Sequence, residues 1–387
     1  MNTYSSYKDS GIEWMGNIPE SWELTKNRFG FLKHKNGLNE SDDTNVLSLT
    51  TTGVKVKRDL NFGKSSESYI GHQLVEQGDI VFTPRDFDQT PILSDVSKYE
   101  GCISNLYIVD KTKENVLNRY VNYYWYGLKY SVDYFKNFSH GMRYSFNRFQ
   151  FDEIPLLIPS LREQQQISDY LDYKTSKIDI LIEKTQQKIE LLKEQRTSLI
   201  NTTVTKGLDP NVEMKDSGVE WIGDVPVGWD LVRLKYLFSL EGGKDPKRIQ
   251  DDDGEYPILG TGGEISRGSD FLYNKPTLLL GRKGTIDKPF LFDKPFWVSD
   301  VMYYTIQKSD ITPKYLYLLF TLTPFDYYRY GSTQPSMSRL DYESMFFPIP
   351  KKEERQQIVD YLDKETSKID KLVDIESKRI ILLKEYR

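Results

Sequence analysis

Apolar residues recur with a helical period over one long stretch near the middle of the chain. Residues 161–204 contain neither Pro nor Gly, so nothing interrupts a helix along this length. The apolar positions within it are three, four or seven residues apart: Leu171, Ile178, Leu181, Ile182, Ile189, Leu192 and Leu199. This spacing predicts a helix with a narrow apolar stripe of the coiled-coil kind, with Glu, Lys and Gln on its other faces. Such a helix needs a partner to bury its stripe.

A second copy of the pattern ends the chain and predicts that partner. Aligning Gln165 with Gln356 places Leu171 on Leu362 and the apolar positions after it on those of residues 352–387. We expect the two helices to pack against each other through Leu171, Ile178, Ile189, Leu192, Leu362, Ile369, Ile380 and Leu383.

A further repeat precedes each helix. Residues 8–22 read KDSGIEWMGNIPESW, and residues 215–229 read KDSGVEWIGDVPVGW. Two tandem units follow from this, each with a short Trp, Gly and Pro segment, a globular stretch and a long helix. Gly and Pro predict an irregular entry for residues 1–22, anchored by burial of Trp14 and Trp22.

The two globular stretches read as mixed helix and strand. Runs rich in Val, Ile, Thr and Tyr predict strands at 46–54, 77–84 and 102–110 in the first stretch, and at 277–286 and 296–306 in the second. A helix is expected at 118–134 and another at 312–322, and each stretch closes with a strand, 154–159 or 346–350, that leads directly into its long helix. The fold class is therefore α+β, with two tandem domains, two long helices and a pseudo-two-fold repeat.

Composition supports two globular domains and gives little guidance on partners. The 387 residues carry a net charge of −5 and a pI of about 5.5, which neither favours nor excludes a local basic face for nucleic acid. The single cysteine, Cys102, cannot form an internal disulfide, and no apolar run approaches the roughly 20 residues that span a bilayer. We expect a cytoplasmic protein.

Motifs for covalent chemistry are missing from the sequence. The glycines Gly260, Gly262 and Gly263 are not followed by Gly-Lys-Ser/Thr, so a tight turn or a loop that approaches DNA is favoured over a phosphate cradle. The histidines His34, His72 and His140 have no metal-ligand spacing, so we expect no metal site. No Asn-Pro-Pro-Tyr or Asp-Pro-Pro-Tyr tetrad of an amino-methyltransferase is present. We expect a protein that is not itself an enzyme.

Binding to a DNA duplex at two places is the alternative that the residues favour. Loops flanked by Gly carry Arg, Lys, Asn, Gln, Ser and Thr, the side chains that contact base edges and phosphates. Aligning Ser145 with Ser336 also brings Arg148 onto Arg339. The candidate DNA-binding residues are Arg85, Asn105, Arg143, Tyr144, Asn147 and Arg148 in the first unit, and Thr261, Arg267, Arg282, Lys283, Gln334, Ser336 and Arg339 in the second.

These residues also carry a family resemblance. The two DSG(I/V)EW segments, the EQQQISDYLD and ERQQIVDYLD helix openings and the LLKEQR and LLKEYR runs resemble the specificity subunit of type I restriction–modification enzymes. The resemblance covers essentially the whole chain. It assigns residues 1–160 to a first target recognition domain, 161–206 to a central helix, 207–350 to a second target recognition domain and 351–387 to a C-terminal helix.

The resemblance further implies that each domain reads one half of a bipartite site in double-stranded DNA. It also implies that the antiparallel helices, with the eight apolar residues named above, form a fixed spacer and the docking surface for partner subunits. The implied partners are two methyltransferase subunits, which use S-adenosylmethionine, and restriction subunits, which use ATP and Mg. Two other classes remain open. One is a decoy or orphan coiled-coil scaffold that binds partners without reading sequence, and the other is a self-sufficient methyltransferase, which would need the missing tetrad.

Overall fold

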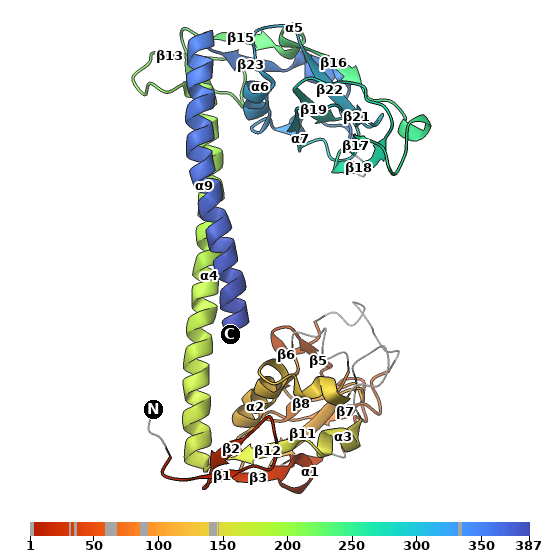
Figure 1. The fold of residues 1–387 in the computed structure, drawn as a ribbon, viewed down its shortest axis with the longest axis vertical. Helices are drawn as coiled ribbons and strands as arrows, with labels where there is room; N and C mark the ends of the chain where they lie inside the picture. The colour runs from red at the N-terminus through yellow and green to blue at the C-terminus, as the bar shows by residue number, and fades with distance from the viewer. Residues whose placement is uncertain are drawn as a thin grey trace. The chain divides into compact units, whose positions relative to one another are not determined.

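The computed structural model describes residues 4–30, 32–34, 37–58, 68–85, 92–138, 145, 147–331 and 335–387. The chain divides into two compact units, Met1–Asp179 and Ile180–Arg387 (Figure 1). Each has its own hydrophobic core and its own four-stranded sheet. The predicted α+β class with a tandem repeat is confirmed.

The first unit opens with a hairpin instead of the expected irregular segment. Strand β1 (Tyr7–Asp9) pairs antiparallel with β2 (Asn17–Pro19). The turn between them places Gly11 and Gly16 at φ of +69° and +61°, backbone angles that glycine adopts without strain. The expected burial of Trp14 is wrong, since its side chain is exposed, whereas Trp22 is partly buried.

The central sheet of the first unit has the order β4 (Leu32–His34), β11 (Ile108–Thr112), β8 (Ile80–Phe82) and β9 (Ser94–Val96). Helix α2 (Asn118–Tyr130) packs on it, and Phe82, Trp125 and Phe151 interlock in the core at ring-centroid distances of 5.0 to 5.3 Å. Strand β3 (Glu23–Lys26), which is followed by α1 (Asn27–Gly30), pairs with β12 (Pro155–Ile158) and so joins the start of the unit to its end.

Three boundaries expected in this unit differ from the structure. The run 46–54 is a hairpin of β5 (Leu47–Thr50) and β6 (Gly53–Val56), because Gly53 takes a φ of +100° and reverses the chain. The run 102–110 is split by a turn into β10 (Gly101–Ile103), which pairs with β7 (Gln73–Val75), and β11. Helix α2 ends at Tyr130, and a 3₁₀ turn, η1 (Tyr134–Phe138), follows before α3 (Arg148–Asp152).

The second unit repeats this plan. A hairpin of β13 (Met214–Asp216) and β14 (Asp224–Pro226) precedes β15 (Asp230–Arg233), which pairs with β23 (Phe346–Ile349). The four-stranded sheet has the order β16 (Phe238–Gly242), β22 (Met302–Gln307), β19 (Thr277–Gly281) and β20 (Phe290–Phe292). A second sheet holds β18 (Gly263–Gly268), β17 (Tyr256–Gly260) and β21 (Trp297–Val298), so the expected strand 296–306 is two strands.

Short helices complete the second unit. They are α5 (Leu234–Leu237), the 3₁₀ turn η2 (Pro246–Arg248), α6 (Pro313–Phe320), α7 (Phe325–Tyr328) and α8 (Arg339–Ser344). Helix α6 stands where α2 stands in the first unit, and Thr312 caps its N-terminus by accepting a hydrogen bond from the Tyr315 N–H.

Both long helices are confirmed. Helix α4 (Leu161–Lys206) runs from the first unit into the second, and α9 (Lys352–Tyr386) closes the second unit. Within the second unit the two are antiparallel, because Lys188 pairs with Glu376 at 2.5 Å and Arg196 with Asp370 at 2.8 Å. The predicted stripe is buried at Ile189, Leu362, Ile369 and Ile380 and partly buried at Leu171, Ile178, Leu192 and Leu383.

The start of α9 is covered more completely than the start of α4. Ile358 and Leu362 are fully buried in the core of the second unit, where the last turns of α4 contribute Ile200 and Val204. The aligned residues of the first unit, Ile167 and Leu171, are only partly buried. Equivalent positions of the repeat are therefore packed differently. Among the residues that the structure describes, no helix is long and apolar enough to cross a membrane.

Candidate nucleic-acid interface

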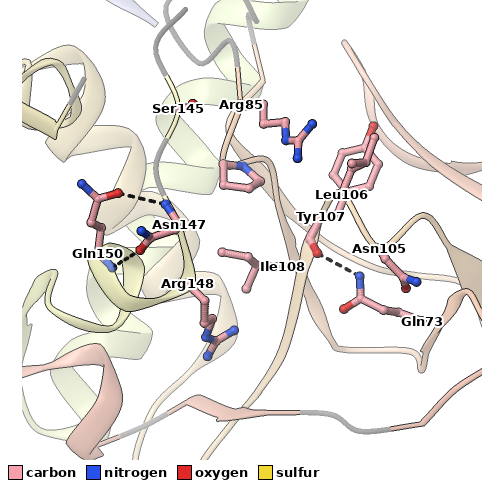
Figure 2. Close-up of a pocket in the computed structure, with 11 residues that line it drawn as sticks. Gln73, Arg85, Asn105, Leu106, Tyr107, Ile108, Ser145, Asn147, Arg148 and Gln150 are labelled. Atoms are coloured by element: carbon pink, nitrogen blue, oxygen red, sulfur yellow. Dashed lines mark hydrogen bonds between the residues drawn. The ribbon is translucent and has the colours of Figure 1, made fainter. Parts of the chain in front are cut away.

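A polar pocket of about 590 Å³ opens on the first unit beyond the end of β8 (Figure 2). It brings together four of the predicted DNA-binding residues, although they come from distant parts of the sequence. Its lining consists of Gln73, Pro84, Arg85, Asn105, Leu106, Tyr107, Ile108, Ser145, Asn147, Arg148 and Gln150. Two further candidates, Arg143 and Tyr144, lie outside the described residues.

Arg148 forms part of the pocket wall, and its guanidinium donates hydrogen bonds to the carboxyl groups of Asp110 and Asp152. Its Nη1 and Nη2 donate to Oδ1 and Oδ2 of Asp110 at 3.0 and 2.9 Å, and its Nε donates to Asp152 at 2.9 Å. Burial raises the pKa of Asp110 to about 8, with the Asp152 and Asp79 charges adding to the rise, and burial lowers the pKa of Arg148. Arg148 thus holds helix α3 against the sheet.

Asn147 and Gln150 fix the start of α3 by a reciprocal capping box. The Asn147 Oδ1 accepts from the Gln150 N–H at 3.0 Å, and the Gln150 Oε1 accepts from the Asn147 N–H at 2.9 Å. Both amide oxygens are therefore engaged. The amide NH₂ groups make no hydrogen bond within the described part of the chain, so they remain available as donors.

Arg85 and Asn105 lie on other walls of the pocket. Figure 2 shows the Arg85 guanidinium between the Asn147–Gln150 pair and the segment from Asn105 to Tyr107. Arg85 is exposed and makes no side-chain hydrogen bond or ion pair within the described residues, whereas the Asn105 Nδ2 donates to the Gly71 carbonyl at 3.0 Å. Arg85 is the cation of this pocket that is available to a ligand.

In the second unit, several predicted contact residues hold loops in place. Arg267 donates to the Gly254 and Glu255 carbonyls at 2.7 and 2.6 Å, and Arg282 donates to the Asp300 carbonyl at 3.3 Å.

Arg339 donates to Glu343 at 2.7 Å, and this hydrogen bond is the main cause of its raised pKa. Thr261 sits in the tight turn between β17 and β18, in agreement with the expectation of a turn at these glycines. Gln334 lies outside the described residues.

Lys283 and Ser336, the last two predicted contact residues of the second unit, are paired through their backbones. They form an isolated antiparallel bridge, as Arg85 and Ser145 do in the first unit. Lys283 is exposed and, like Arg85, has no side-chain partner among the described residues.

Sequence reasoning missed Gln73, Tyr107 and Gln150 on the pocket wall. The Gln73 Nε2 donates to the Tyr107 carbonyl at 2.8 Å, a contact between distant segments that leaves no local signal. The spacing of Asn147 and Gln150 is that of a capping box and could have revealed the role of both residues. No cluster of His, Cys, Asp and Glu suited to a metal ion occurs in the described ranges.

The two α+β units carry Arg, Asn, Gln and Lys side chains of the kinds that contact base edges and phosphates. Comparison with known proteins makes this specific. The family model described as type I restriction modification DNA specificity domain matches residues 29–191 and, a second time, residues 226–385. The chain belongs to this family of DNA specificity domains.

Relatives and solved structures agree with this assignment. The chain is 24% identical over 401 residues to a putative type I restriction enzyme MjaX specificity subunit of Methanocaldococcus jannaschii, with 94% of this chain and 90% of the relative covered. It is also 24% identical over 263 residues to the MjaIX specificity subunit of the same organism, covering 62% and 60%.

Among solved structures, the fold resembles a chain from a study of complex assembly and conformational transition in a type I R-M system. The TM-score is 0.69 at 16% identity, with 95% and 96% of the two chains covered. It also resembles the HsdS subunit of Thermoanaerobacter tengcongensis, with a TM-score of 0.56 at 14% identity and 98% and 96% covered. These likenesses concern the fold.

Proposed function

We propose that this chain is the non-catalytic, sequence-reading subunit of a type I restriction–modification enzyme, in which each unit reads one half of a bipartite site in double-stranded DNA. The observation that carries the proposal is the duplication: two units with one sheet order and one helix arrangement enclose different loops. A constant frame with variable loops suits a protein that must present two different reading surfaces.

The proposed DNA contacts are the polar side chains at the loops of each unit. Guanidinium groups match the acceptor edge of guanine, amides match adenine, and hydroxyl and ammonium groups suit phosphates. The pocket of the first unit offers a guanidinium and amide groups together in Arg85, Asn105, Asn147 and Gln150. Arg148 and Arg339 already donate to carboxyl groups, so they are less suited than Arg85 to contacting DNA.

The proposed partners are methyltransferase and restriction subunits that perform the chemistry. S-adenosylmethionine, ATP and Mg would be bound by these partners and not by this chain. Apolar side chains that α9 leaves exposed support docking on the helices: Leu372, Ile375, Ile381 and Leu382. The paired helices would also set the unread gap between the two half-sites.

The deciding experiment maps DNA methylation in cells that carry the gene and in cells from which it has been deleted. A bipartite methylated site that disappears with the gene supports the proposal. Unchanged methylation would favour a scaffold that binds partners without reading DNA. The purified chain alone, given S-adenosylmethionine and DNA, should transfer no methyl group, and transfer without partner subunits would contradict the non-catalytic role.

A further inference from the structure

One basic residue occupies the same position in both units. Strand β8 pairs Phe82 with Ile108, and β19 pairs Leu280 with Tyr303, each in the third place of a four-stranded sheet of the same order. Arg85 lies three residues beyond Phe82, and Lys283 lies three residues beyond Leu280. Arg85 and Lys283 therefore both lie just beyond the third strand of the sheet, and each forms a backbone bridge to a serine that precedes a short helix.

The segment that faces this residue is also repeated. Arg85 bridges to Ser145 and Lys283 to Ser336, both antiparallel. Each serine lies three residues before the arginine that opens a short helix, Arg148 of α3 or Arg339 of α8. Each helix is fixed by a capping box, Asn147 with Gln150 in one unit and Ser338 with Asp341 in the other.

The arginine that opens each helix and the basic residue at the bridge differ in their partners. Arg148 is held by Asp110 and Asp152, and Arg339 is held by Glu343. Arg85 and Lys283 are exposed and have no carboxylate or other side-chain partner among the described residues. In both units, one cation is paired with a carboxyl group and the other is left for a ligand.

The surroundings of the two free cations differ between the units. Arg85 lines the same pocket as Asn105, Asn147 and Gln150 (Figure 2). In the second unit, the Gly284 N–H donates to the Pro335 carbonyl at 2.9 Å and the Met337 N–H donates to the Arg282 carbonyl at 3.0 Å, which fixes the loop that bears Lys283. One position with different side chains around it can read two different sequences.

Resting on the proposed function, we infer that Arg85 and Lys283 are equivalent specificity-determining residues, each of which contacts a guanine in the half-site of its own unit. Arg148 is a positioning residue that ties α3, just after the bridging serine, to Asp110 on β11, whereas Arg339 pairs with Glu343 within α8. Arg85 presents a planar fork that matches the O6 and N7 acceptors of guanine, and Lys283 presents a single ammonium group to the same edge.

The test uses the complete chain assembled with its methyltransferase subunits. Its DNA probes carry the mapped site or a version with one base pair of one half-site changed. Arg85→Ala should reduce discrimination at one G·C pair of one half-site by roughly five- to 150-fold and leave the other half-site unaffected. Lys283→Ala should do the reverse. Arg85→Lys should keep overall binding but lose part of the discrimination, because the bidentate geometry is gone.

Matched controls remove an exposed lysine elsewhere in each unit. Lys98→Ala and Lys294→Ala lose the same charge on turns away from the bridges and should leave discrimination unchanged. An equal loss on all sequences in Arg85→Ala would show a phosphate contact and overturn the inference, as would no change. If the unmutated complex discriminates at neither half-site, the proposed function itself fails, so the two failures are distinguishable.

Discussion

The unequal burial of two aligned leucines gives a sharp test of how the repeat is packed. Leu362, on α9, is fully buried in the core of the second unit, whereas Leu171, at the aligned position of α4, is partly buried in the first. The same truncation, Leu362→Ala or Leu171→Ala, thus removes the same atoms from two environments. Only burial and packing differ between the two variants.

The expected magnitudes follow from burial. A fully buried Leu→Ala change loses the transfer free energy of the side chain and leaves a cavity, so Leu362→Ala should lower the free energy of unfolding of its unit by about 3 kcal/mol. Leu171 keeps contact with water and leaves a site open to solvent, so its loss should cost about 1 kcal/mol. Leu372, 43% exposed on the same helix as Leu362, is the control, and its truncation should cost less than about 0.5 kcal/mol.

Hydrogen exchange measured by mass spectrometry can follow each unit separately, which matters because a two-unit chain need not unfold in one step. Amides of β19 and β22 report on the second unit, and amides of β8 and β11 report on the first. Leu362→Ala should speed exchange in the second unit by about 100-fold, and Leu171→Ala should speed it in the first by roughly fivefold. Equal effects would refute the reasoning, because they would mean that the start of α4 is packed as tightly as the start of α9.

Three further changes test the site and the helices. Arg148→Ala should destabilise the first unit by about 2 kcal/mol in urea unfolding, since it removes both hydrogen bonds that Arg148 donates to the buried Asp110 carboxyl group; a change within about 0.5 kcal/mol would show that the pair is not structural. Burial raises the pKa of Asp110 from about 4 to about 8, so between these pH values the folded state holds a proton that the unfolded state has lost. The free energy of unfolding of the first unit should therefore fall as pH rises from about 4 to 8. Asp110→Asn should remove this slope. A flat profile for the unmutated chain would show that Arg148 keeps the carboxylate ionised. Inserting four residues between Glu183 and Lys193 adds about 6 Å of helix and keeps the apolar stripe nearly in phase, so methylation mapping should find the same half-sites one to two base pairs further apart, and an unchanged gap in an active variant would contradict the spacer role.

The long helices could be predicted from the sequence almost completely, and the strands only in part. A continuous apolar stripe without Pro or Gly permits one interpretation, and α4 and α9 follow it. The apolar run 46–54 permits two interpretations, a single strand or a hairpin. The backbone of Gly53 decided for the hairpin, and the same kind of turn split 102–110 and 296–306.

The site was predictable as a set of residue types but not as a set of roles. The alignment of Ser145 with Ser336 correctly matched the two helix openings. The partner of Arg148 is Asp110, 38 residues away on a central strand, and no local sequence pattern predicts that pair. Likewise, the correspondence of Arg85 with Lys283 depends on their backbone bridges to Ser145 and Ser336, which only the folded chain displays.

The pairing of β3 with β12, and of β15 with β23, affects how the segments between these strands can be exchanged in evolution. Each strand pair holds the two ends of the intervening segment side by side. The 128 residues between Lys26 and Pro155, and the 112 between Arg233 and Phe346, therefore begin and end at neighbouring positions. The entropic cost of closing loops of these two lengths differs by only about 0.1 kcal/mol, so the length of the segment hardly changes the free energy of forming the strand pair. Two crossovers in the repeated flanking sequences could therefore replace the coding sequence of one segment by homologous recombination. The recognised half-site would change, and the strand pair at the ends of the segment would stay the same.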